Sequence, residues 1–247
     1  MAGRGDAAQA PLVPTEAGWE YKAIGRSGVY PVKEPFGFDQ NRTGGIDDQQ
    51  KKTGSMVSAF INAYFATCHV PVIGISASQG GTGIDQWLTG KNMFADLSAR
   101  IRKAKADLPA LGYSIDRTIL LWMQGETDAD HEMSGEEYSR KLALFTESIF
   151  QDGVTDFFLI PIGCYNGEES RSGYEMIRQA QISFSLQNEK VKTATMLAST
   201  YKAKGWMKDA FHYEQRAYNE MGWDAGINAA KERMKQYDTR IKGRGFA

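Results

Sequence analysis

A carboxylate and an imidazole lie close together near the C-terminus, in Asp209-Ala210-Phe211-His212. A carboxylate three residues before a histidine can orient one imidazole nitrogen and leave the other free as a general base. The chain has 247 residues and 3 histidines, and only His131, near Asp128, has an acid at similarly short spacing. The spacing is common by chance, so the pair needs other catalytic groups beside it.

Two further segments combine glycines or an amide with a preceding apolar run. In Gly80-Gly81-Thr82-Gly83-Ile84-Asp85-Gln86-Trp87, adjacent glycines let a backbone N–H approach a ligand, although the segment also suits a tight strand-to-helix turn. In Trp122-Met123-Gln124-Gly125-Glu126-Thr127-Asp128, the amide can donate to a developing oxyanion. The alternative is an amide that satisfies loop backbone and carboxylates that cap a turn.

Helix and strand signals alternate regularly from Ser55 onward, after about fifty irregular residues rich in Gly, Pro and polar side chains. We expect strands over 70–75, 118–122, 156–160 and 192–197, and helices over 55–67, 92–106, 134–153, 174–187 and 214–237. This alternation predicts an α/β fold in three layers, α/β/α, around a parallel sheet. Ligands in such folds bind beyond the carboxyl ends of the strands, where the three polar segments fall.

Composition excludes several other functions. The net charge of −1, from 29 basic and 30 acidic residues, gives no reason to expect nucleic acid or a membrane surface as a partner. No apolar run is long enough to span a bilayer. The 2 cysteines form no CxxC pattern, so we expect neither a metal site nor a metal cofactor. The length suits a single domain over residues 1–247.

Taken in their order, the three polar segments resemble the SGNH (GDSL-like) hydrolases. Within these, the chain is similar to the branch of sialate O-acetylesterases and carbohydrate esterases that includes acetyl xylan esterases. The branch patterns GGT-x-I-x-x-W, W-x-QGE-x-D and D-x-x-H match in full at residues 80–87, 122–128 and 209–212. The resemblance spans nearly the whole chain. It implies a flavodoxin-like parallel sheet, an acetylated carbohydrate as substrate, and no cofactor.

The resemblance also implies roles for individual residues. His212 would be the general base, Asp209 would hold it in the right tautomer, and Gly81 and Gln124 would stabilise the oxyanion. Gly80, Trp87 and Glu126 are candidates near the substrate, with a core position for Trp87 and loop support by Glu126 as alternatives. Tyr165, Asn166 and Arg171 are further candidates for contacts with the sugar, with a solvated charge as the alternative for Arg171.

The family nucleophile is a serine in a first block, Gly-Gln-Ser-Asn-Met, which this sequence does not contain. The chain begins Met1-Ala2-Gly3-Arg4-Gly5, which resembles the tail of that block, so we expect the serine just upstream of Met1. Ser76 and Ser78 are poor replacements, because neither lies in G-x-S-x-G.

The same comparison predicts that the first, interior strand of the sheet is missing. Two strands would then face each other with unpaired backbone groups, at roughly 1–3 kcal/mol for each buried group. A few such groups match the ~5–15 kcal/mol stability of a domain, so the chain would be unstable or rely on a partner strand. Alternatively, residues 27–32 fill the space.

Two other functions stay open at this point. The chain is a non-catalytic glycan-binding relative if it truly lacks the nucleophile. It is a nucleotide-binding protein if residues 80–83 cradle phosphate, although it has no Walker lysine, and Gln86 stands where GxGxxG needs a glycine. A secreted or periplasmic full-length form is compatible with the sequence.

Overall fold

The computed structural model describes the backbone of residues 3–243 and the side chains of residues 3–237. Its strands are β1 (Gly18–Lys22), β2 (Gly28–Pro31), β3 (Val72–Ile75), β4 (Ile119–Trp122), β5 (Asp156–Leu159) and β6 (Val191–Thr193). Its α-helices are α1 (Val57–Cys68), α2 (Asn92–Ala110), α3 (Glu126–Asp130), α4 (Gly135–Gln151), α5 (Ser172–Gln187) and α6 (Gln215–Gly243). Short 3₁₀ helices cover Ala7–Gln9, Ile84–Trp87 and Leu197–Thr200.

The strands form two sheets of three strands each, in the orders β2-β1-β3 and β4-β5-β6. β1 runs parallel to β3, and β5 runs parallel to both β4 and β6. β3, β4, β5 and β6 are the four strands that the alternation predicts, which confirms the α/β class and the parallel arrangement.

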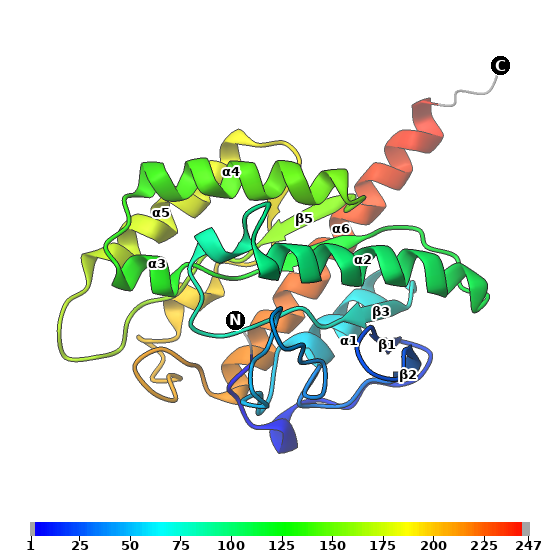
Figure 1. Cartoon of the computed structure of the whole chain (residues 1–247), viewed down its shortest axis with the longest axis horizontal. Helices are drawn as coiled ribbons and strands as arrows, with labels where there is room; N and C mark the ends of the chain where they lie inside the picture. The colour runs from blue at the N-terminus through cyan, green and yellow to red at the C-terminus, as the bar shows by residue number, and fades with distance from the viewer. Residues whose placement is uncertain (1–2, 244–247) are drawn as a thin grey trace.

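Helices cover both faces of the second sheet, as β5 shows most clearly (Figure 1). Its side chains alternate between two apolar clusters because successive residues of a strand point to opposite faces. Phe157 and Leu159 pack in a cluster with residues of α2, α4 and α5, whereas Phe158 and Ile160 pack with residues of α1 and α6. The protein therefore has the three layers expected from its sequence. Among the described residues, no helix is both long and apolar enough to cross a lipid bilayer.

β3 and β4 are not paired with each other, and a cavity of about 920 Å³ lies between them. The cavity extends to the loops at the carboxyl ends of both strands, and its volume is far beyond the small voids of a packed core. β5 is fully buried, but all of β3 and the first three residues of β4 are only half-buried. The predicted break in the sheet is thus present. The alternative, that residues 27–32 fill it, is wrong, because β2 pairs antiparallel with β1 on the far side of β3.

β1 and β2 lie in the stretch that we expected to be irregular, and that expectation is wrong for these residues. β1 joins β3 directly, so its middle residue, Glu20, is only 3% exposed. Burial raises the pKa of Glu20 to about 7. A charged residue at a buried strand position masks the apolar pattern from which strands are predicted.

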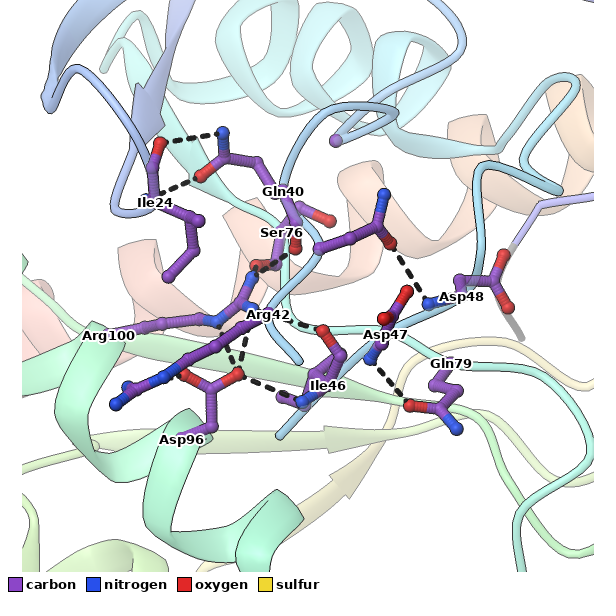
Figure 2. A network of polar contacts seen from close by, with 12 residues as sticks. Ile24, Gln40, Arg42, Ile46, Asp47, Asp48, Ser76, Gln79, Asp96 and Arg100 are labelled. Atoms are coloured by element: carbon purple, nitrogen blue, oxygen red, sulfur yellow. Dashed lines mark hydrogen bonds and ion pairs between the residues drawn. The ribbon is translucent and has the colours of Figure 1, made fainter. Parts of the chain in front are cut away.

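A buried arginine ties this N-terminal stretch to the end of β3 (Figure 2). The Arg100 guanidinium donates to the carbonyl of Ser76 at 2.7 Å, to that of Gln40 at 3.0 Å, and to Asp96 at 2.8 Å. Asp96 also accepts from the Ile46 N–H at 3.0 Å. The Arg100–Asp96 ion pair therefore fixes the loop over residues 40–46 against the carboxyl end of β3.

We predict that Arg100→Met lowers the free energy of unfolding by about 3–5 kcal/mol, because it leaves the buried Asp96 carboxylate with only the 55% exposed Arg42 at 3.2 Å and removes the donor to the Ser76 and Gln40 carbonyls. Arg102→Met is the matched control: its side chain is 66% exposed and lies 3.4 Å from Asp152, so the expected change is within about 1 kcal/mol. Urea unfolding of both variants checks the pair. Equal losses would show that the Arg100 network does not anchor the loop.

Candidate active site

Asp209 and His212 form a hydrogen-bonded pair just before α6. His212 Nδ1 lies 2.8 Å from Asp209 Oδ2, and the N–H groups of Phe211 and His212 each donate to Asp209 Oδ1 at 2.8 Å. Burial opposes ionisation of Asp209, but these hydrogen bonds outweigh it and hold the pKa of that carboxyl below its usual range. An ionised Asp209 fixes the proton of His212 on Nδ1 and leaves Nε2 available as a base.

His212 is one-third exposed and lines the same cavity as Gly81 and Gln124. The cavity thus connects the two segments after β3 and β4 with the segment before α6. His212 Nε2 makes no hydrogen bond to any described residue. The structure therefore brings the three motifs together at the carboxyl ends of β3 and β4, the edge at which α/β folds bind ligands.

Gly81 presents a backbone N–H with no acceptor among the described residues. Its φ of +67° suits glycine, and a Cβ added there would meet nothing within 4 Å. The neighbouring Gly80 N–H is already used, since it donates to Asp48 Oδ1 at 2.9 Å. Asp48 in turn holds Arg4 through two hydrogen bonds of 2.8 and 3.0 Å. Gly81 is thus the open donor of this loop, and Gly80 is its anchor.

The Gln124 amide, the other expected oxyanion donor, is engaged within the protein. Its Nε2 donates to the Thr82 carbonyl at 2.8 Å and to the Asp128 carboxylate. Asp128 also accepts from the Ile84 N–H at 3.0 Å. Gln124 is only 7% exposed. In this structure it therefore joins the loops after β3 and β4 and has no free N–H.

Side chains from two helices hydrogen-bond to the backbone of Gln124. The hydroxyl of Tyr138 on α4 and the amide of Gln181 on α5 donate to the Gln124 carbonyl at 2.8 and 2.6 Å. Gly125 follows with a φ of +143°, and a Cβ there would lie 2.9 Å from Ile177. The glycine of the Gln-Gly-Glu motif is therefore needed for the close approach of α5.

Trp87 and Glu126 differ in their surroundings. Trp87 is 3% exposed, packs edge-on against Trp122 at 5.3 Å between ring centroids, and donates to Thr82 Oγ1 at 3.0 Å. The structure thus gives Trp87 the core position and no open ring face. Glu126 lies at the start of α3 beside the cavity, and its Oε1 is buried with no hydrogen-bond partner among the described residues.

An aromatic cluster adjoins the His–Asp pair. The Tyr165 ring lies 5.3 Å from that of Phe211, and the Arg171 guanidinium stacks on Tyr165 at 4.0 Å. Arg171 also pairs with Asp130, which offsets its charge. Asn166 is tied to the same segment, since its backbone N–H donates to the Ala210 carbonyl at 2.9 Å.

No described serine or cysteine is hydrogen-bonded to His212. Ser76 is 4% exposed, and its Oγ accepts from Lys52 Nζ at 2.9 Å. Among the described residues, no group of three or more His, Cys, Asp or Glu side chains is arranged to hold a metal ion. The cavity is thus lined by an imidazole whose Nδ1 is held by a carboxylate and by the open backbone N–H of Gly81.

Sequence reasoning missed the residues that position this site: Arg4 with Asp48, Tyr138, Gln181, and Arg100 with Asp96. Arg4 and Asp48 lie 44 positions apart, and Gln181 lies 57 from Gln124. No local pattern joins such pairs, because only the folded chain brings them together. The helix expected over residues 134–153 corresponds to α4, and the Ser134 hydroxyl accepts from the Glu137 N–H at 3.1 Å at its start.

A comparison with known protein families places the chain in one of them. The sequence model of a family described as "carbohydrate esterase, sialic acid-specific acetylesterase" matches residues 1–229. No curated protein matches the chain. A solved structure from Arabidopsis thaliana has a similar fold, with 19% identity, a TM-score of 0.66, and coverage of 94% of this chain and 93% of the other.

A carbohydrate acetylesterase from Sinorhizobium meliloti is more distant, with 11% identity, a TM-score of 0.45, and coverage of 94% and 96%. A variant of an acetyl-xylooligosaccharide esterase from Geobacillus has 11% identity, a TM-score of 0.44, and coverage of 92% and 95%. We therefore take the family from the sequence match, and the Arabidopsis structure supports the fold alone.

We predict that Tyr138→Phe lowers the free energy of unfolding by about 1–3 kcal/mol, because it removes a buried hydroxyl that serves Gln124 and Gln181. Tyr30→Phe makes the same chemical change at an exposed hydroxyl that donates to the Arg26 carbonyl, and we expect it to cost less than about 0.5 kcal/mol. Chemical unfolding measures both. An unchanged free energy of unfolding for Tyr138→Phe would mean that the hydrogen bond from Tyr138 to Gln124 contributes nothing to stability.

Proposed function

Because the chain belongs to the carbohydrate esterases described as sialic acid-specific acetylesterases, we propose that it removes acetyl groups from sugar hydroxyls by a serine-esterase mechanism. The substrates in view are acetylated sialic acid and acetylated plant polysaccharide such as xylan. The observation that carries the proposal is the Asp209–His212 pair, which shares one cavity with the open N–H of Gly81. A base beside an oxyanion donor is what acyl transfer from an ester requires.

The proposed nucleophile is a serine that precedes the described residues. Its Oγ attacks the acetyl carbonyl carbon while His212 Nε2 takes the hydroxyl proton. The tetrahedral intermediate collapses, the bond to the sugar oxygen breaks, and His212 gives its proton to that oxygen. Water, deprotonated by His212, then attacks the acetyl-enzyme, which releases acetate and restores the serine. Asp209 stays ionised throughout and stabilises the imidazolium.

Gly81 is the proposed main oxyanion donor, because its N–H is open in the resting site. Gln124 is the proposed second donor, and one of its two hydrogen bonds must open first. The bond to the Asp128 carboxylate is charge-assisted and therefore stronger than the bond to the neutral Thr82 carbonyl. The N–H that now serves Thr82 is thus the one that turns toward the intermediate.

The proposed sugar contacts differ in strength of support. Tyr165 and Phe211 offer aromatic surface next to His212, on which a sugar ring can pack. Arg171 adds little net charge because Asp130 is bound to it, so nothing here selects strongly for an anionic sugar. Gly80, Glu126 and Trp87 act in this scheme by holding the loops, with the Glu126 carboxylate nearest to the cavity.

A non-catalytic glycan-binding protein is the second candidate. The observation that favours it is the lack of any described serine hydrogen-bonded to His212. Such a protein would keep the sugar contacts and the Gly81 donor and would release no acetate.

We predict that His212→Ala lowers kcat/KM for 4-nitrophenyl acetate by at least about 10³-fold in the polypeptide extended upstream of Met1, because it removes the base. His131→Ala is the matched control, since His131 is exposed in the turn after α3, and we expect activity within about twofold. Acetate release from acetylated xylo-oligosaccharide and from O-acetylated sialic acid separates the two substrates. Equal activity of both variants, or no turnover with retained binding to an acetylated glycan, would overturn the esterase proposal.

Gly81→Ala provides an independent prediction. Gly81 and Gly90 both have positive φ, and at both an added Cβ would meet nothing within 4 Å, so the backbone strain is matched. The new methyl group at residue 81 lies beside the open N–H, and we expect kcat/KM to fall by about 10²-fold. Gly90→Ala should lose about 1 kcal/mol of stability and keep its activity. Esterase kinetics and thermal unfolding of the two variants decide. Equal effects of the two substitutions on kcat/KM would contradict the proposed role of Gly81 as an oxyanion donor.

A further inference from the structure

A small polar cavity adjoins the candidate active site at the loop over residues 47–51. Its volume is about 140 Å³, and its lining side chains are all polar: Arg4, Asp47, Asp48, Gln49, Lys51 and Gln79. Four of its lining residues, Gly80 included, also line the large cavity shared by Gly81 and His212. A ligand bound in the active site can therefore extend into this polar cavity.

Two of the lining side chains are fully engaged and form the fixed part of the cavity. Asp48 accepts from the Arg4 guanidinium at 2.8 and 3.0 Å and from the Gly80 N–H at 2.9 Å. The Asp48 side chain is only 3% exposed. This buried carboxylate thus joins the chain start, the loop over residues 47–51 and the loop after β3 into one rigid frame.

The other four side chains keep hydrogen-bonding atoms free. Gln79 Oε1 accepts from the Asp47 N–H at 2.7 Å, as Figure 2 shows, which leaves the Gln79 NH₂ group available as a donor. Asp47 Oδ1 accepts from the Gln49 N–H at 2.9 Å, and Asp47 Oδ2 stays open as an acceptor. The Gln49 amide and Lys51 Nζ make no hydrogen bond to any described side chain or backbone group. Donors and acceptors therefore stand side by side in the cavity.

Backbone strain occurs in the same loop. Gln49 and Gln50 follow each other with φ values of +52° and +56°, the left-handed region that residues other than glycine rarely adopt. The hydrogen bonds of Asp47 hold the chain in this turn. Strained backbone of this kind clusters at ligand sites. Gln49 lines the small cavity, whereas Gln50 lines neither of the two cavities.

The lining selects a neutral ligand that carries hydroxyl groups. The two cations, Arg4 and Lys51, are balanced by the two carboxylates, Asp47 and Asp48, so neither an anion nor a cation is favoured. A hydroxyl both donates and accepts, which suits the mixed free groups. Sites that enclose a drug-sized ligand have about 300–1,000 Å³, so a cavity of about 140 Å³ takes one small ring.

We propose that this cavity binds one neutral sugar ring of the substrate, next to the ring that carries the acetyl group. The acetylated ring is assigned above to Tyr165 and Phe211, and neither of these lines the small cavity. A substrate that occupies both places has at least two rings. An acetylated xylo-oligosaccharide meets this requirement, whereas free acetylated sialic acid leaves the polar cavity empty.

The two parts of this inference have different foundations. The binding of a neutral sugar ring stands on the cavity alone. The identification of that ring as part of an esterase substrate rests on the proposed function.

The test titrates the 247-residue chain with xylotetraose and with xylose and follows the amide signals by NMR. We expect xylotetraose to bind at least about 10-fold more tightly, because a single ring cannot reach both the aromatic surface and the polar cavity. The signals that shift with xylotetraose should include those of residues 47–51 and 79–80.

Gln49→Ala and Gln50→Ala form a matched pair, because both side chains are exposed glutamine amides on left-handed backbone. Gln49→Ala removes an amide that lines the cavity, and we expect its affinity for xylotetraose to fall by about 3- to 10-fold, the loss of about one hydrogen bond. Gln50→Ala should bind xylotetraose as the parent chain does. The same ratio is expected in kcat/KM for acetylated xylotetraose in the polypeptide extended upstream of Met1.

Three results would overturn the proposal: no binding of xylotetraose, equal affinities for xylotetraose and xylose, or equal binding by the Gln49→Ala and Gln50→Ala variants. Binding that depends on Gln49, without acetate release by the extended polypeptide, would leave the sugar site intact and refute only the proposed function. Acetate release from acetylated xylotetraose that does not depend on Gln49 would do the reverse.

Discussion

A strand in the middle of a parallel sheet needs a hydrogen-bonded neighbour on each side, and the rest of this structure depends on that constraint. β3 and β4 each have one neighbour, and the cavity between them lies directly beneath the loops that carry Gly81 and Gln124. Those loops are positioned by strand ends, so the separation of β3 and β4 sets the distance across the site. A strand between them would complete the sheet and fix the spacing of the proposed oxyanion donors relative to His212.

Three sets of contacts around the cavity hold the two sheets in place. On one side, α1 and α6 pack against each other over much of their length, and glycines of α6 allow the close approach. On the other, Gln124 bonds the Thr82 carbonyl, which joins the loop after β3 to the loop after β4. The Arg100–Asp96 pair adds a third tie, from α2 to the end of β3. These contacts explain how a discontinuous sheet can still present an organised site.

Much of this architecture could be predicted from the sequence, for identifiable reasons. β3 to β6 could be predicted because each is a short apolar run between amphipathic helices. The motif residues could be predicted as a group because they follow the ends of strands, which meet at one edge of a parallel sheet. β1 could not be predicted, because Glu20 at its centre suggests a loop. Arg4 and Asp48 could not be paired from local spacing. The motif left open whether the Gln124 amide is free for a ligand or satisfies loop backbone, and the fold shows that Thr82 and Asp128 use both of its N–H groups.

A serine esterase mechanism with His212 as its base is the central proposal, and covalent labelling of the natural polypeptide tests it. A fluorophosphonate reacts with an activated serine, and mass spectrometry of the digested product then locates the modified residue. We expect a single label, on a serine that precedes Met1, and no label in His212→Ala. A label on Ser76 or Ser78, or acetate release without any labelled serine, would contradict the account.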